Sequence, residues 1–323
     1  MALPAHRVHA DTPHVATDIA PVHSLVAQVM EGVGTPDLIL PPGADPHGHS
    51  LRPSEASALE RADLVVWVGP ALTPWLKNPL ETLAAKAQHR VLMDVDGTIL
   101  IAMRDGAGFE GHDHGHENRD DHEDHEEHGD HDDHDDHDDH EDHDEHQHND
   151  GGPIDPHAWL DPENALLWLS AITEDLAALD PENASIYAAN AAKGQARILQ
   201  AQSQAQALLA PLHDTPFIVM HDAYHYFEAR FDLHARAAIT SGDAERPSPA
   251  RIDEVRHIAE DTGTRCIVAE TAANSGLVEA VLPGGQDHVT VIDPLGTQFN
   301  PGPHLYPALL SDVAIRLSEC FQN

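Results

Sequence analysis

The chain of 323 residues carries 56 acidic and only 17 basic side chains, which gives a formal net charge of −39. This charge argues against a nucleic-acid partner, because neutralising phosphates requires a basic face. No apolar run of about 18 residues occurs, so the sequence contains no candidate membrane span. An acidic field of this size would instead raise the local concentration of cations.

Short β-branched runs alternate with helical stretches along most of the chain. This alternation predicts parallel sheets with helices on both faces, which is an α/β fold. Helices are predicted at 22–31, 53–61 and 249–262. The predicted strands are 14–17, 37–40, 64–69, 91–95, 217–220, 266–269 and 289–292.

Residues 181–210 predict one long helix, because this stretch has no internal proline and Gly194 is its only glycine. A helix of about 30 residues is about 45 Å long, enough to run between two lobes. Four predicted strands precede it and three follow it. We therefore expect two lobes, each a mostly parallel sheet flanked by helices, at 14–180 and 211–323, joined by the helix 181–210.

The segment 110–150 interrupts the first lobe with an extreme composition. Its 41 residues hold 13 histidines, 21 acidic residues and a single base, Arg119. Imidazole and carboxylate are the ligands of a divalent metal such as zinc. Because the segment has almost no apolar residues, we expect disorder and loose metal binding rather than one rigid site. A solvated acidic spacer is the alternative. The histidines concerned are His112, His114, His116, His122, His125, His128, His131, His134, His137, His140, His143, His146 and His148.

Outside that insert, four short segments place metal-type ligands where loops leave strands or enter helices. A lone histidine after a strand is more often a structural residue than a ligand. Four such segments, two in each expected lobe, change that balance, because ligands of open α/β sheets bind beyond the carboxyl ends of strands. The segments are 41–54 with His47 and His49, 155–164 with His157, 217–227 with His221 and His225, and 289–297 with Asp293.

The two cysteines, Cys266 and Cys320, do not form a CxxC motif, so a thiolate zinc site is not indicated. Two buried free thiols and one disulfide in an oxidising compartment are equally compatible with the sequence. The amino-terminal MALPAHRVHADTPH has neither an apolar signal region nor a lipid-anchor cysteine. It fits a cytosolic protein or a mature chain whose signal peptide was removed.

Five motifs in order carry a family resemblance: PPGADPHGHSLRPS, ADLVVWVGP, DPHAWLDPEN, HDAYHYF and IDPLGT. With them the chain resembles the zinc-type, ZnuA-like solute-binding proteins of bacterial ABC importers, within the cluster A-I family. That resemblance implies a periplasmic receptor of two α/β lobes linked by a rigid helix. It implies that Zn²⁺ binds between the lobes and passes to an ABC permease at the inner membrane, and that the insert 110–150 is a low-affinity zinc-collecting loop.

Carried over motif by motif, the resemblance implies the metal ligands His47, His157, His221 and Asp293. It also implies a disulfide between Cys266 and Cys320. Manganese-type relatives have a carboxylate at the position of His221, and the softer imidazole favours zinc.

Two positions depart from the family pattern. His49 stands where tyrosine is common, and we weigh it as a fifth ligand, a hydrogen-bond donor behind a ligand, or an exposed ring. Pro46 stands where some zinc members have a carboxylate. His225 lies four residues after His221, which is one helical turn, so the two side chains could lie on one face of a helix. His225 is therefore a candidate additional ligand. A histidine at the surface, or one that hydrogen-bonds to a ligand, is the commoner alternative.

Four protein ligands leave no coordination position for an attacking water, so we expect a receptor and not an enzyme. A zinc hydrolase is a rival, but the chain lacks HExxH. A metal-buffering or adhesin-like surface protein is the other alternative. We expect a monomer, with periplasmic zinc chaperones as further candidate partners.

Overall fold

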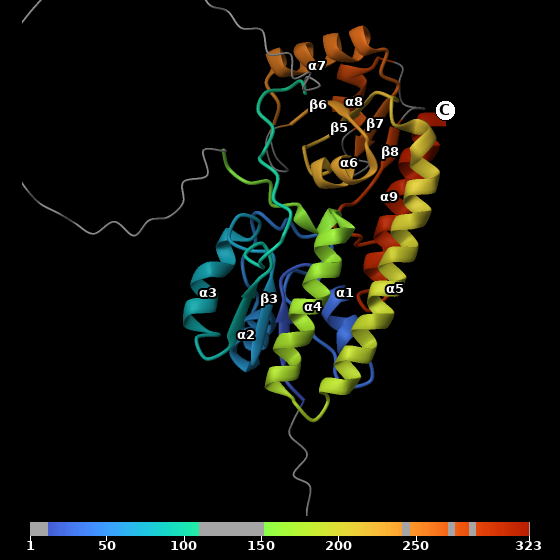
Figure 1. The fold of residues 1–323 in the computed structure, drawn as a ribbon. Coiled ribbons are helices and arrows are strands. Elements are labelled where there is room, and N and C mark those ends of the chain that lie inside the picture. Colours follow the sequence, from blue (N-terminus) through green and yellow to red (C-terminus); the bar gives the residue numbers. More distant parts are fainter. Residues whose placement is uncertain (1–11, 110–151, 241–245, 271–274, 284–288, 323) are drawn as a thin grey trace, which may run out of the picture.

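Two parallel four-stranded sheets form the centres of the molecule. The computed structural model describes residues 12–109, 152–240, 246–270, 275–283 and 289–322 (Figure 1). The first sheet has the order β2-β1-β3-β4, and the second has the matching order β6-β5-β7-β8. The strands are β1 (Val15–Thr17), β2 (Asp37–Leu38), β3 (Leu64–Trp67), β4 (Gln88–Val91), β5 (Phe217–Val219), β6 (Ala235–Ala238), β7 (Cys266–Ala269) and β8 (Val289–Val291).

Helices cover both sheets, as the alternating sequence pattern predicts. The α-helices are α1 (Ala20–Val29), α2 (Pro53–Arg61), α3 (Lys77–Thr82), α4 (Pro162–Leu179), α5 (Ala184–Leu209), α6 (His225–Phe231), α7 (Pro249–Thr262), α8 (Ser275–Val281) and α9 (Leu305–Gln322). Short 3-10 turns cover Pro74–Leu76, Ala158–Leu160 and Ala210–Leu212. None of the helices in the described ranges is long and apolar enough to cross a membrane.

The long helix predicted between the lobes is confirmed as α5. It has 26 residues and begins at Ala184, somewhat later than the predicted position 181. Asp180 explains the delay, because its carboxylate accepts hydrogen bonds from the Asn183 side chain and the Tyr187 hydroxyl and holds a turn before the helix. Gly194 allows close packing of α5 on α1, because a Cβ there would lie 2.9 Å from the Gln28 side chain of α1 and would force it to shift.

A second helix, α9, runs beside α5 and ties the two sheets together (Figure 1). It contacts β7 and β8 of the second sheet and also α1 beside the first. The Tyr306 amide donates to Ser24 of α1, and the Tyr306 hydroxyl donates to the Trp159 carbonyl. One apolar core therefore continues from α1 through α4, α5 and α9 to β5 and β7, which opposes a wide hinge motion.

One predicted strand was misplaced, and one strand of the structure was not predicted. A strand was expected at 91–95, but β4 ends at Val91 and takes in the polar residues before it. β4 lies at the edge of the first sheet, and its first two residues, Gln88 and His89, are exposed. An edge strand of this kind does not need a continuous run of apolar residues. The strand β6 was not predicted at all, because its sequence Ala-Arg-Ala-Ala has low strand propensity. It forms as an edge of the second sheet, paired with β5.

Cys266 at the start of β7 forms a disulfide with Cys320 of α9, as the family resemblance implies. Both cysteines are buried. The bond therefore fixes the carboxyl-terminal helix to a central strand of the second sheet.

We expect reduction of this disulfide to lower the free energy of unfolding by about 2–4 kcal/mol, because it releases a closed loop of the unfolded chain. Urea denaturation with and without reductant measures the change. A Cys266→Ala/Cys320→Ala variant is the control and should not respond to reductant. Identical transitions of the oxidised and reduced wild-type chain would contradict this expectation.

Candidate metal centre

His221 lies just beyond the carboxyl end of β5. The Met220 amide donates to the Val268 carbonyl and so extends the pairing of β5 with β7 by one residue. His221 then leaves the sheet with 3% of its surface exposed. The Ala223 amide donates to the His221 carbonyl and holds the turn that leads to α6. A central strand of the second sheet thus sets the position of this imidazole.

His157 comes from the segment that enters the first lobe before α4. Its backbone amide and its Nδ1 lie 2.9 and 2.7 Å from Oδ1 of Asp155, and both residues are buried. The Asp155 amide donates to the Ile101 carbonyl, which fixes this segment against the chain that precedes the insert. The imidazole therefore has a defined orientation.

His47 lies in the long loop after β2 and is half-buried. Its amide donates to Asp45, while the carbonyl of neighbouring Pro46 accepts from the Trp75 indole. These bonds fold the loop back toward the carboxyl end of the first sheet.

Three of the four predicted ligands come together from these three loops. The Nε2 atoms of His157 and His221 lie 3.5 Å apart, and their ring centroids 5.3 Å. The rings of His47 and His157 meet edge to face at 5.6 Å. Within the described ranges, no three histidine, cysteine or acidic side chains already enclose a common point tightly enough to hold an ion. The imidazoles meet in pairs, with His157 in the middle.

Asp293 follows β8, and its loop lies against the two histidine loops. Hydrogen bonds on both sides of Asp293 hold the loop. The Tyr224 hydroxyl donates to the Ile292 carbonyl. The Trp159 indole donates to the Pro294 carbonyl. Its carboxylate accepts bonds from Leu295 and from the amide and hydroxyl of Thr297. Oδ1 accepts only one of these bonds, so the arrangement orients the carboxylate and leaves lone pairs for a cation.

The structure gives His49 and His225 different surroundings from the cluster. His49 Nε2 lies 2.8 Å from Glu55, and its ring packs edge to face on Trp75 at 5.1 Å. Both contacts brace the His47 loop. His225 starts α6, where burial and the positive charge of Arg104 lower the pKa of its imidazole. The ring contacts described for the cluster do not include His225.

Three further residues of the site are not among the ligands predicted from the sequence: Arg104, Asp155 and Glu270. Arg104 belongs to the segment that runs from the first lobe to the edge of the second sheet, just before the insert (Figure 1). At that edge the Phe109 amide donates to the Arg236 carbonyl. The Arg104 guanidinium forms ion pairs with Asp222, the neighbour of His221, and with Glu228 of α6.

Arg104 and its two carboxylates form a largely buried ion cluster. The guanidinium lies 3.8 Å from the centroid of the Phe109 ring. Burial alone would lower the pKa of Arg104, but the carboxylates of Glu228 and Asp222 raise it. The cluster clamps the turn that carries His221 to the chain segment beside His157.

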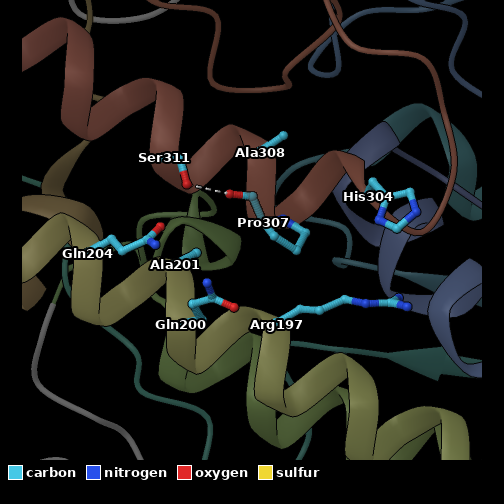
Figure 2. Close-up of a pocket in the computed structure, with 8 residues that line it drawn as sticks. All are labelled: Arg197, Gln200, Ala201, Gln204, His304, Pro307, Ala308 and Ser311. Carbon is cyan, nitrogen blue, oxygen red and sulfur yellow. Dashed lines mark hydrogen bonds between the residues drawn. The ribbon is translucent and has the colours of Figure 1, made fainter.

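A groove lies elsewhere, on the face between α5 and α9 (Figure 2). Its volume is about 300 Å³. Figure 2 shows Arg197, Gln200 and Gln204 on one side and Pro307, Ala308 and Ser311 on the other. It contains none of the predicted ligands, and a compact ion needs no groove of this size. The histidines of the insert 110–150 lie outside the described residues.

Solved structures share this fold of two parallel sheets. A crystal structure of ZnuA matches with a TM-score of 0.74 and 20% identity, covering 96% of this chain and all of the other. A zinc-bound deletion mutant of ZnuA matches with a TM-score of 0.70 and 19% identity, covering 96% of this chain and 98% of the other.

Sequence comparison then gives the family. The model of the periplasmic component A of zinc-uptake complexes matches residues 15–320. The high-affinity zinc uptake system protein ZnuA of Paracoccus denitrificans is 44% identical over 320 residues, which are 99% of this chain and 94% of that relative. The chain belongs to the ZnuA family.

We expect Arg104→Met to lower the free energy of unfolding by about 3–5 kcal/mol, because it leaves two carboxylates without their buried cation. Chemical denaturation of the metal-free chain measures the loss. Arg316→Met is the control, since the Arg316 side chain is 40% exposed and its partner Asp312 lies one turn away on the same helix, and it should cost under about 1 kcal/mol. Equal losses for the two variants would contradict a clamp at Arg104.

Proposed function

We propose that this chain is the high-affinity zinc receptor of an ABC importer. It captures Zn²⁺ between its two lobes and delivers the ion to a permease at the inner membrane. The observation that carries the proposal is the meeting of three imidazoles from loops far apart in the sequence, in a member of the ZnuA family.

The separation of two ligand atoms supports a tetrahedral zinc site. Two nitrogens that each lie about 2.0–2.1 Å from a tetrahedral zinc are about 3.3–3.4 Å apart. The Nε2 atoms of His157 and His221 lie 3.5 Å apart, so small shifts would fit both to one ion. His47 would supply the third nitrogen and Asp293 the only oxygen.

The chemistry of this ligand set favours zinc over harder divalent ions. Three neutral imidazoles and one carboxylate bind a borderline metal better than magnesium, calcium or manganese, which prefer oxygen ligands. The bound site would keep a net charge of about +1. The acidic chain around it would attract the incoming cation.

Capture would involve the loops more than the lobes. The continuous core, α5 and α9 resist a rigid-body swing, whereas His47 and His157 lie on loops. We infer that the rings move together by small local shifts around the ion. The proposed ligand set is complete without water, so the receptor would not catalyse hydrolysis.

The remaining parts of the proposal concern partners and the insert. The receptor would act as a monomer of two lobes, 14–180 and 211–323, joined by the helix 181–210. Periplasmic zinc chaperones are further candidate partners. The insert 110–150 would bind several ions loosely, because fixing the chain around each site costs about 1–2 kcal/mol per residue.

Deleting residues 110–150 should leave one tightly bound zinc per chain and remove only weak binding. Isothermal titration calorimetry of the deletion variant against the full chain measures both classes of site. His47→Ala in the full chain is the reciprocal variant and should weaken the tight site while weak binding persists. If the deletion abolished tight binding, the insert would be part of the main site.

His221→Ala should fail to support growth of a zinc-starved strain that depends on this receptor, because the tight site loses a central ligand. His257→Ala removes an exposed imidazole of α7 and should grow like the wild type. Equal growth of both variants would favour the metal-buffering or adhesin-like alternative over uptake.

A further inference from the structure

His157 and His221 each have a carboxylate on the ring nitrogen that faces away from the other ring. Oδ1 of Asp155 lies 2.7 Å from Nδ1 of His157. Oε1 of Glu270 contacts Nδ1 of His221. The two remaining nitrogens, the Nε2 atoms, face each other at 3.5 Å.

The register of the second sheet places Glu270 beside His221. The parallel strands β5 and β7 pair Val219 with Val268. His221 and Glu270 each lie two residues beyond this pair, at the same carboxyl edge of the sheet. The two side chains are 49 positions apart in the sequence (270 minus 221), yet neighbouring strands deliver them to the same point.

This arrangement determines which nitrogen of each ring carries the proton. An ionised carboxylate accepts hydrogen bonds and donates none, so each Nδ1 must carry the hydrogen. The neutral ring then has its lone pair on Nε2. Both lone pairs then point into the space between the two rings, whose Nε2 atoms lie 3.5 Å apart, and one cation there could bind both.

We propose that Glu270 and Asp155 are positioning residues that hold both imidazoles in the Nδ1–H tautomer and direct both Nε2 lone pairs at one zinc ion. The inference rests on the proposed function, because it requires both histidines to be ligands. Such carboxylate partners also raise the basicity of the imidazole, and their loss typically weakens metal affinity about 10–100-fold.

Glu270 gives a cleaner test than Asp155. Asp155 also accepts the backbone amide of His157, so its replacement would disturb the loop itself. Glu270 is 22% exposed, and its described contact is with the imidazole. A change there acts on His221 with little effect on packing.

The test measures zinc affinity of the full chain by competition with a chromophoric chelator. We expect Glu270→Leu to weaken the tight site about 10–100-fold. Glu270→Gln keeps an acceptor oxygen for Nδ1–H without the charge and should recover part of the loss. Glu254→Leu removes an exposed carboxylate of α7 and should bind like the wild type.

A second readout separates positioning from a general structural role. ¹⁵N-histidine NMR of the metal-free chain should show His221 protonated on Nδ1 in the wild type and a mixture of tautomers in Glu270→Leu. The His221 signals are assigned by their loss in His221→Ala.

The results for His221→Ala and the Glu270 variants separate failure of the positioning role from failure of the ligand set. If His221→Ala loses tight zinc but both Glu270 variants bind within about threefold of the wild type, the positioning role is wrong and the receptor assignment stands. If His221→Ala itself keeps tight binding, the ligand set is wrong and the positioning role falls with it. An unchanged His221 tautomer in Glu270→Leu would also overturn the inference.

Discussion

The two buried nitrogens that face each other across 3.5 Å, Nε2 of His157 and Nε2 of His221, are the constraint on which the rest of the site depends. Buried polar atoms are costly unless they have a partner. The carboxylates behind the rings direct both of these nitrogens, as acceptors, toward the space between the rings. A divalent ion that prefers nitrogen would bind both lone pairs there, and the affinity of the site would depend on their fixed orientation. The same argument explains why the loops are held so firmly: Asp155, Glu270 and the Arg104 cluster all fix the orientation of one of the two rings.

The architecture confines the motion that capture needs to short loops. The two sheets share one apolar core, and the disulfide secures α9, which packs beside α5 and contacts elements of both lobes. Rotating one lobe would therefore break packing that costs far more than a loop shift. His47, by contrast, lies on a half-buried loop, and its ring meets the His157 ring edge to face. We infer that it is the ligand with the largest freedom to move.

Sequence patterns predicted the parts of this protein that repeat along the chain, and they missed those that depend on pairing in space. Alternating strands and helices predicted the two parallel sheets, and proline-free, alanine-rich sequence predicted α5. Low strand propensity concealed β6, because the neighbouring strand β5 and not the alanines stabilises it. Histidines at the ends of strands could be predicted as metal ligands from the sequence. The role of Glu270 could not, because only the register of β5 against β7 brings it to His221. Arg104 was equally hidden, since its partners Asp222 and Glu228 lie more than a hundred residues away.

A crystal grown with zinc and measured at the zinc absorption edge tests the central claim most directly, because anomalous scattering locates the ion without assumptions about its ligands. The account requires one fully occupied ion between the lobes, about 2.0–2.1 Å from Nε2 of His47, His157 and His221 and from a carboxylate oxygen of Asp293. Nδ1 of His157 and of His221 should still face Asp155 and Glu270. An ion bound through Nδ1 of either ring, or one that lies away from these four side chains, would contradict the account.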